Sequence, residues 1–255
     1  MKRVCKGQEP APLFAFRQRQ PDATWDDMRH QDRSAVEACR QQASADQHGL
    51  CAYCERKINT LPTHKWRVEH FHPKSDSSVG KNWHLDWQNM LACCNGGESE
   101  GSGQHPLPDN LSCDAHKSHL TNTGKLPIQL EAELCNPLHL PAFPNLFTFD
   151  KGTGHLRADA NACVQISYDA AKLERTIDEI LNLNCERLSR LRRTIVVNID
   201  RNKKILRQKG YPLSQIPAAL IQRYFNGKWP EFFTTIRCCL GSMAEDYLRS
   251  IHYQG

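Results

Sequence analysis

Long apolar runs are missing from this sequence. No stretch reaches the eighteen or so consecutive apolar residues that a membrane-spanning helix needs, so we expect no membrane partner. The first twelve residues, MKRVCKGQEPAP, carry charges but lack the apolar stretch of a secretion signal. Internal repeats and low-complexity tails are missing as well. These absences favour a cytoplasmic protein.

The sequence also lacks a strong excess of charge of either sign. Charged residues make up 24% of the chain and mix both signs, leaving a net charge of +5 and an isoelectric point near 8.6. Such mixing predicts a folded protein with a well-hydrated surface. The mild basicity suits an anionic partner such as nucleic acid. At 255 residues, the chain can form one large domain or two small ones.

The amino-terminal half shows one clear helical pattern. Residues 1–30 are expected to be extended or loop-like, because Pro10, Pro12 and Pro21 interrupt them. Thr24 is a suitable N-cap for a helix over about 25–46. Residues 95–112 are rich in Gly, Ser and Pro without periodicity, which predicts a long surface loop.

The carboxy-terminal half begins with a short β pattern and is then helical. Apolar pieces within 135–168 are separated by KGTG, which predicts a small hairpin. From Ala170, apolar residues recur every three or four positions, with a phase step at LNLN. Asn184 is expected to cap a helix to about Gln208, closed by Gly210, and two more helices are expected near 213–226 and 229–252.

Paired cysteines predict a structural zinc site. Cys51-x-x-Cys54 can direct two sulfurs at one ion, and the later cysteines are the adjacent pair Cys93-Cys94 and then Cys113. One of the pair together with Cys113 would complete four ligands. In a reducing compartment, this spacing favours metal over disulfides. Two alternatives are buried free thiols and a site in which His116 or His119 replaces a sulfur.

A histidine-rich stretch, VEHFHPKS, lies between the two halves of this predicted site. In an extended strand, His70 and His72 share one face while Glu69 points to the other. A histidine can take a proton from water near neutral pH, and a carboxylate can hold Mg²⁺. Downstream, Asn89 follows in WQNMLACC. If residues 114–120 are helical, Asp114 and Lys117 lie on one face, one toward a metal and one toward a phosphate.

The order CAYC, VEHFHPKS, WQNMLACC and CDAHK resembles the HNH nucleases. The resemblance implies an α+β protein with a zinc-stapled ββα-metal core and a metal-dependent endonuclease activity. It implies that His70 activates water, that Glu69 and Asp114 hold Mg²⁺ or Mn²⁺, and that Asn89 orients His70. The family's ligand spacing selects Cys94 over Cys93. Glutamate at 69 and aspartate at 114 depart from the commoner family residues, although both keep an oxygen donor.

Further stretches, including VCKGQEPAPLFAFR and LNLNCERLSRLRR, are similar to PtuB, an HNH effector of Septu and retron-linked anti-phage systems. This similarity implies a PtuA-like ATPase partner, docked on the helical carboxy-terminal half. A retron reverse transcriptase complex is a second possible partner. Lys74 and Lys117 are expected auxiliary phosphate contacts, and His72 an auxiliary residue of open role. The RLSRLRR run at 187–193 is expected to be solvated or to face a partner.

The expected organisation has four segments. They are an extended segment and helix at 1–48, the nuclease core at 49–125, a small β and loop connector at 126–168, and the helical docking region at 169–255. An alternative function is a non-catalytic zinc module that recognises nucleic acid or tethers the ATPase. DNA and RNA remain equal candidates as substrate, because such a site contacts mainly the phosphate backbone.

Overall fold

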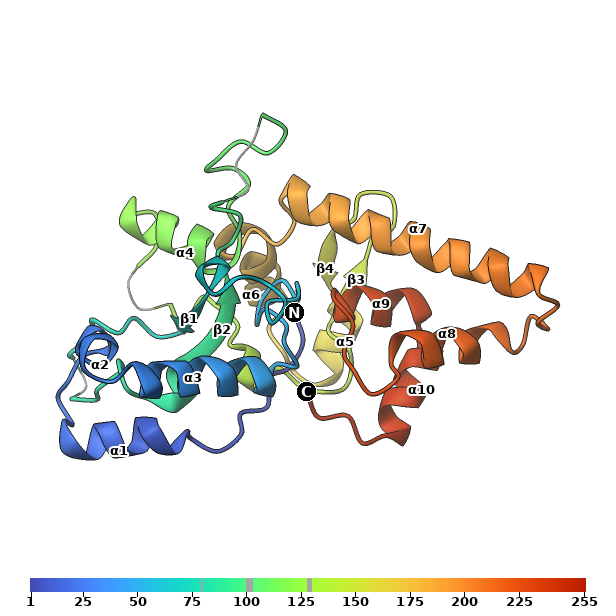
Figure 1. The fold of residues 1–255 in the computed structure, drawn as a ribbon. Helices are drawn as coiled ribbons and strands as arrows, with labels where there is room; N and C mark the ends of the chain where they lie inside the picture. Colours follow the sequence, from blue (N-terminus) through green and yellow to red (C-terminus); the bar gives the residue numbers. More distant parts are fainter. Residues whose placement is uncertain (79, 100–102, 128–129) are drawn as a thin grey trace.

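A computed structural model describes residues 1–78, 80–99, 103–127 and 130–255 (Figure 1). It has two small antiparallel sheets surrounded by helices, which confirms the α+β class. Within these residues, no helix is both long and apolar enough to cross a membrane. The elements are α1 (Ala11–Arg19), α2 (Trp25–Gln31), α3 (Arg33–Asp46), η1 (Thr63–Lys65), β1 (Trp66–His70), η2 (Trp87–Asn89), β2 (Met90–Cys94), α4 (Cys113–Asn122), η3 (Pro137–His139), β3 (Phe147–Phe149), β4 (Leu156–Ala158), α5 (Ala160–Gln165), α6 (Ala170–Arg175), the π-helix η4 (Thr176–Ile180), α7 (Glu186–Gln208), α8 (Ile216–Tyr224), α9 (Phe233–Leu240) and α10 (Ser242–Ser250).

The amino-terminal region contains more helix than the sequence predicted. Pro10 and Pro12 precede and open α1 instead of preventing it, because proline fits the first turn of a helix. Thr24 caps α2 as expected, with Asp27 completing a capping box. The predicted helix over 25–46 is interrupted at Asp32, whose carboxylate accepts from the Ala35 amide and starts α3.

The strands β1 and β2 form an antiparallel ribbon that positions the site. Trp66 pairs with Cys94 at one end, and His70 pairs with Met90 at the other. Every residue of β2 is buried, and α3 and α4 contact it. The predicted loop over 95–112 contains no helix within 95–99 and 103–112, while residues 100–102 lie outside the described residues.

The predicted hairpin is present as β3 and β4. Asn184 does not cap the following helix, because its side-chain amide bonds both backbone groups of Leu156 and thereby joins α7 to β4. Cys185 occupies the cap position instead. The helix predicted over 229–252 is divided into α9 and α10 at Gly241, whose φ of 59° ends the first helix.

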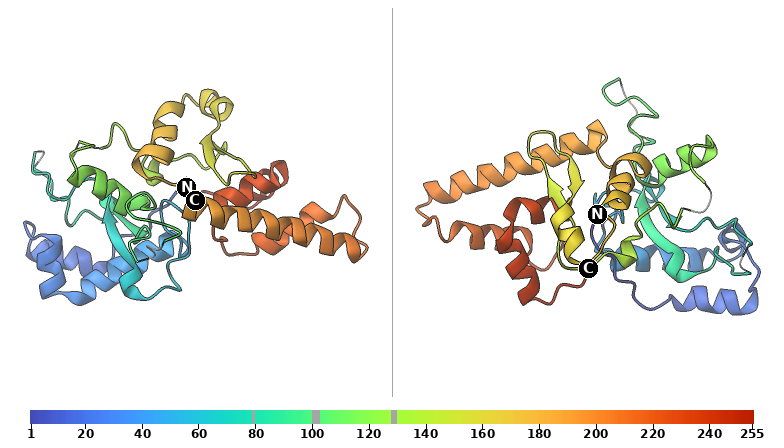
Figure 2. Two further views of the ribbon diagram at one scale, coloured as in Figure 1. Left: turned by 90° about the horizontal axis from the view of Figure 1, so that it is seen from above. Right: turned by 180° about the vertical axis from the view of Figure 1, so that it is seen from behind.

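The arginines at the start of α7 have two different environments. Arg187 and Arg192 are buried, so the expectation of a solvated or partner-facing run is wrong for them. Arg192 donates to the Gly154 carbonyl at 3.3 Å, while Arg190 is exposed. Beyond this anchored start, α7 extends away from the ribbon with α8 beside it (Figures 1 and 2).

Hydrogen bonds to one residue, Glu55, join the cysteine turn to the carboxy-terminal helices. Glu55 follows Cys54 with a φ of 63°. Its backbone carbonyl accepts from the Phe232 amide at 3.0 Å, and its carboxylate accepts from the Thr234 amide at 2.9 Å. Because Glu55 is buried, these bonds hold α9 firmly against the turn.

Candidate active site and metal centre

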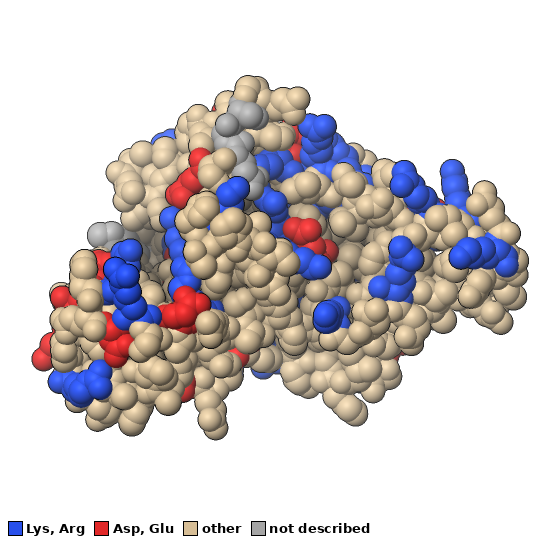
Figure 3. Space-filling view, viewed as in Figure 1, with Lys and Arg blue, Asp and Glu red and all other residues tan. Residues whose placement is uncertain are grey.

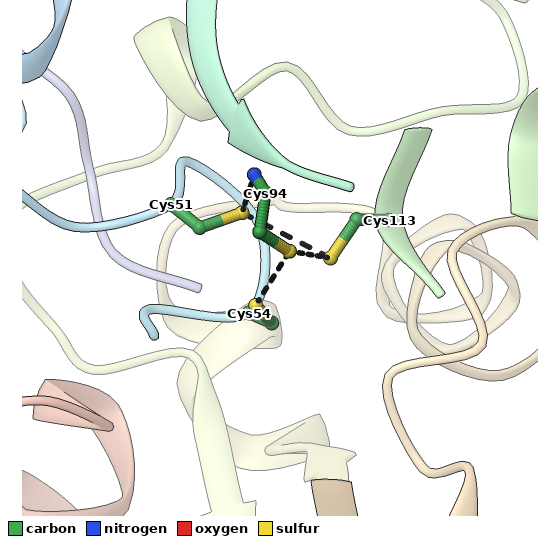
Figure 4. A group of neighbouring side chains, drawn as sticks. All are labelled: Cys51, Cys54, Cys94 and Cys113. Carbon is green, nitrogen blue, oxygen red and sulfur yellow. Dashed lines mark hydrogen bonds between the residues drawn. The ribbon is translucent and has the colours of Figure 1, made fainter. Parts of the chain in front are cut away.

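Four cysteine sulfurs meet in one buried group (Figure 4). The Sγ atoms of Cys51, Cys54, Cys94 and Cys113 all lie within 4.8 Å of one another. Neighbouring sulfurs are 3.6 Å apart for Cys54 and Cys94, 3.8 Å for Cys94 and Cys113, and 3.9 Å for Cys51 and Cys113. All four are free thiols. The structure therefore brings together the four residues that the sequence grouped as zinc ligands.

This group fits a metal such as zinc. In a tetrahedral site with zinc–sulfur bonds of about 2.3 Å, the sulfurs lie about 3.8 Å apart, close to the separations found here. Burial raises the pKa of the Cys113 thiol well above its ordinary range. Burial also opposes ionisation of Cys51, but thiols including Cys113 and Cys54 lower its pKa. A single thiolate can therefore exist in this group without a cation, whereas four thiolates would need a cation bound between them.

Cys93 lies outside the group of four, although its Sγ is 3.6 Å from that of Cys51. In the ribbon, Cys93 pairs with Arg67 and Cys94 pairs with Trp66. The four sulfurs that all lie within 4.8 Å of one another include that of Cys94 and leave out that of Cys93, which contacts the group from the side of Cys51. Cys94 also donates its backbone amide to the Cys51 sulfur at 3.4 Å.

A tight contact between loops places Cys113 beside Cys94. The Ser112 amide donates to the Gly96 carbonyl at 2.9 Å. The buried Arg187 guanidinium donates to the same carbonyl and to the Ser112 hydroxyl, at 3.1 and 2.9 Å. Gly96 has a φ of 62°, and a Cβ there would lie 2.1 Å from the Ser112 oxygen. The start of α4, which carries Cys113, is therefore fixed to the end of β2.

Glu69 of β1 and Asp114 of α4 form a buried carboxylate pair. Lys117 donates its ammonium to Glu69, and its Nζ lies 3.5 Å from an Asp114 oxygen. Arg67 approaches the other Asp114 oxygen at 3.2 Å, and the Tyr53 hydroxyl donates to Glu69 at 3.3 Å. The helix α4 places Asp114 and Lys117 three residues apart on one face, as the sequence predicted.

The pKa values of the two carboxyls are shifted in opposite directions. Burial, followed by the charge of Asp114, raises the pKa of Glu69 well above its usual range. Burial opposes ionisation of Asp114, but a hydrogen bond from Glu69 and the charges of Lys117 and Arg67 lower its pKa. The two carboxyls therefore ionise at different pH, Asp114 before Glu69. Two hard oxygen donors side by side fit Mg²⁺, which is commonly held by one or two carboxylates and several waters.

His70 ends β1 as a buried, neutral histidine. Its Nε2 lies 3.0 Å from the His84 carbonyl oxygen. Since a carbonyl can only accept, Nε2 carries the proton and Nδ1 presents a lone pair. Burial lowers the pKa of His70 to about 4, so at neutral pH the ring carries no charge and keeps the single proton on Nε2. The Trp25 ring meets it edge-on with centroids 5.1 Å apart.

Asn89 supports the segment that carries the His70 acceptor. Its side-chain oxygen accepts from the His72 amide at 2.6 Å. Its amide nitrogen donates to the carbonyls of His72 and Trp83, at 3.0 and 3.1 Å. Asn89 therefore joins the chain leaving β1 to the chain returning toward β2, next to His84. These bonds do not reach the carboxylate pair.

The auxiliary residues lie in three different places. His72 is bonded at both ring nitrogens, to Glu131 through Nδ1 and to Asp76 through Nε2 at 2.8 Å. Lys117 is buried against the carboxylates instead of facing outward. Lys74 is 38% exposed, lies 3.8 Å from Asp26, and lines an open cleft beside His84.

Sequence reasoning did not identify Arg67, Tyr53 or the His84 carbonyl. A signal was present for Arg67, because strand alternation places it on the same face as Glu69. Tyr53 lies inside the CAYC turn and is fully buried. The His84 carbonyl becomes apparent only when the loop after β1 returns to the ribbon.

Comparison with known proteins found one informative relative. The chain is 37% identical over 246 residues to a protein of Escherichia coli described as "Retron Ec83 putative HNH endonuclease". The match covers 93% of this chain and 92% of that protein. No family model matches the chain. The relative is thus similar along nearly its whole length.

Proposed function

This chain belongs to the HNH endonuclease family, and from that premise we propose that it cleaves nucleic acid at a ββα-metal site formed by β1, β2 and α4. In this proposal His70 is the general base and Glu69 and Asp114 hold Mg²⁺ or Mn²⁺. The observation that carries it is the state of His70, which is neutral with a lone pair on Nδ1 and directly follows Glu69 of the buried carboxylate pair in β1. A non-catalytic zinc module would not need that arrangement.

The proposed steps use the chain's own residues as follows. His70 takes a proton from water at Nδ1, while the bond from Nε2 to the His84 carbonyl stabilises the imidazolium that results. Asn89 keeps that carbonyl in place through the bonds to His72 and Trp83. Lys74 is exposed enough to meet a phosphate of the substrate.

A divalent cation on Glu69 and Asp114 would polarise the scissile phosphodiester and stabilise the departing oxygen. Lys117 and Arg67 are paired with the same carboxylates, so the cation would have to replace these ion pairs. We further propose that Cys51, Cys54, Cys94 and Cys113 bind structural zinc at the opposite end of the ribbon. The match between their sulfur separations and a tetrahedral site supports this assignment.

The decisive experiment compares wild-type protein with His70→Ala on plasmid DNA and on structured RNA, with and without Mg²⁺. We expect cleavage only with the cation, and a loss of about 10²- to 10⁴-fold in the variant, the range for removal of a general base. His64→Ala is the matched control, because His64 is exposed on η1. Equal cleavage by the wild type and His70→Ala would refute the catalytic role of His70.

We also propose that the enzyme is the effector of a retron-associated anti-phage system and acts with a PtuA-like ATPase. The name of the relative supports the retron association. The projecting pair α7 and α8 is the proposed docking surface. Val197 on α7 is 58% exposed, Leu213 in the connection between α7 and α8 is 69% exposed, and Lys and Arg side chains gather over α7 (Figure 3).

Substitution of Val197 tests the docking surface. Val197→Asp should prevent co-purification with the ATPase and leave His70-dependent cleavage unchanged. Val164→Asp is the control, because Val164 is 79% exposed on α5, away from this pair of helices. Co-purification of the Val197→Asp protein at the wild-type level would exclude this surface.

A further inference from the structure

A large cavity opens at the His70 end of the ribbon. Its volume is about 870 Å³, within the range of small-molecule sites. Its lining includes Asn89 and His72, so the wall that supports His70 also bounds the cavity. The other walls come from residues 3–6, from the segment before β2, and from residues 131–139 and 167–172. The cavity is therefore adjacent to the proposed catalytic strand and distinct from the carboxylate pair.

Aromatic side chains from three segments line this cavity. They are Phe71, Trp83 and Tyr168. Phe71 follows His70 directly, and Tyr168 is half-buried two residues before α6. Trp83 is covered by the His72 ring and by the Lys81 ammonium, and Phe71 is buried, so the partly exposed Tyr168 is the ring among these that is offered for stacking. The amide side chains of Gln88 and Asn136 add hydrogen-bonding groups to the same surface. This combination is typical of sites that hold a planar heterocycle.

The charges in the cavity nearly cancel. Its cations are balanced by carboxylates, with Arg3, Lys6, Lys81 and Lys172 against Asp86, Glu131 and Asp169. Lys81 pairs with Asp86 at 2.6 Å, and Lys172 donates to the Glu131 carbonyl at 2.7 Å. A site for a polyanion would show an excess of unneutralised cations. The balance favours an uncharged planar group over a phosphate.

One wall of the cavity is held rigidly before any ligand arrives. The His72 ring stacks on Trp83 with centroids 3.9 Å apart and an angle of 23°. Its ring nitrogens are fixed by Asp76 and Glu131, from two different segments. This order reduces the entropy that binding would otherwise cost. In this arrangement His72 supports the cavity wall and contacts neither metal nor phosphate.

We propose that this cavity accepts one unpaired nucleobase of the substrate strand, adjacent to the phosphate that is cleaved. The inference rests on the proposed nuclease function and adds its substrate class, a single-stranded or locally unpaired nucleic acid. A base within a duplex would first have to leave its stack to enter. Base-edge contacts from Gln88 and Asn136 then provide sequence preference next to the cut.

The experiment combines removal of the base with removal of the stacking residue. Fluorescent single-stranded DNA and RNA oligonucleotides carry one abasic site at each position near the mapped cut. For the wild type, one position should raise KM by about 5- to 140-fold, the range that corresponds to loss of a single stacked base. With Tyr168→Leu, intact substrate should show a similar rise, and the abasic site should have no further effect.

Matched variants separate recognition from loss of folding. Tyr224→Leu, at a half-buried tyrosine of α8 outside the cavity, should keep the wild-type abasic profile. Gln88→Ala removes an exposed cavity side chain and should change base preference at the same position without lowering the melting temperature. The outcome that overturns the inference is a flat abasic profile for an active wild type, or additive effects of Tyr168→Leu and the abasic site.

Failure of the nuclease proposal gives a different result from failure of the cavity proposal. If the wild type cleaves nothing, the nuclease proposal fails, and anisotropy with the same oligonucleotides still measures base-dependent binding. If cleavage is normal and Tyr168→Leu instead loses the ATPase partner, the cavity binds protein and the nucleobase assignment is wrong.

Discussion

Replacement of Gly96 by alanine tests how the metal centre is assembled. Gly96 has a φ of 62°, and its carbonyl accepts the Ser112 amide next to Cys113 of the four-cysteine group. A Cβ at this position would lie 2.1 Å from the Ser112 oxygen and 2.6 Å from the Ala115 Cβ. Backbone atoms cannot rotate away, so the end of β2 and the start of α4 would have to separate.

The expected loss of stability has three parts. A left-handed φ costs an alanine about 1–2 kcal/mol relative to glycine. Loss of the buried Ser112–Gly96 hydrogen bond costs about 1–3 kcal/mol, and forcing a methyl group into packed surroundings costs about 1–3 kcal/mol. Part of this is relieved by relaxation, so Gly96→Ala should lower the free energy of unfolding by about 3–5 kcal/mol.

Gly124 provides the matched control. It has a φ of 70° just after α4, and nothing lies within 4 Å of a Cβ placed there. Gly124→Ala should therefore show only the backbone cost of about 1–2 kcal/mol. Urea unfolding of both variants, with zinc content measured on the purified proteins, separates the two effects. Equal stability of the two variants, within about 0.5 kcal/mol, would refute the close approach as the cause.

Three further predictions concern the ribbon and its surroundings. By elemental analysis, Cys94→Ser should lower bound zinc from one equivalent to a small fraction, whereas Cys93→Ser should keep the full equivalent. Loss of zinc from both variants would contradict the group of four cysteines. Asn89→Ala should lower kcat by about 10²-fold through misplacement of the base, with the Mg²⁺ concentration for half-maximal rate unchanged; a shift in that concentration instead would assign Asn89 to the metal. Burial lowers the pKa of Lys6 from 10.5 to about 7. The unfolded chain therefore binds more protons between these pH values, and the free energy of unfolding should rise with pH across this window. Lys6→Met should flatten that rise in urea titrations, and an unchanged slope would show that Lys6 is not responsible.

The Cys51–Cys54 pair and the strand β1 could be predicted from sequence because their signals are local, whereas the choice of Cys94 came from the family resemblance. The gap between Cys51 and Cys54 and the alternation of β1 depend only on neighbouring residues. The partners of His70 and Glu69 could not be predicted in the same way. His84 reaches His70 only after the loop beyond β1 returns, and Lys117 reaches Glu69 from another element, 48 residues away in sequence.

Helix ends were also harder to predict than helix existence. Asp32 and Gly241 each interrupt a continuous apolar pattern, through a side-chain cap and through a positive φ respectively. Asn184 looked like a cap, but tertiary contact with Leu156 takes its side chain. In each case a contact or backbone angle that periodicity does not encode decides the boundary.

The bond between Glu55 and α9 has a consequence for how this protein can evolve. If recombination replaced the helices after α7 with those of a diverged relative, the Glu55 carboxylate would remain buried without the Thr234 amide. The Met1 amino group would still lie 3.3 Å from Glu55, but a buried carboxylate that loses a hydrogen-bond donor costs about 1–3 kcal/mol, a sizeable share of the stability of a typical domain. The helical half is therefore expected to be inherited together with the cysteine turn, and exchange of partner specificity should proceed by substitution on exposed positions such as Val197.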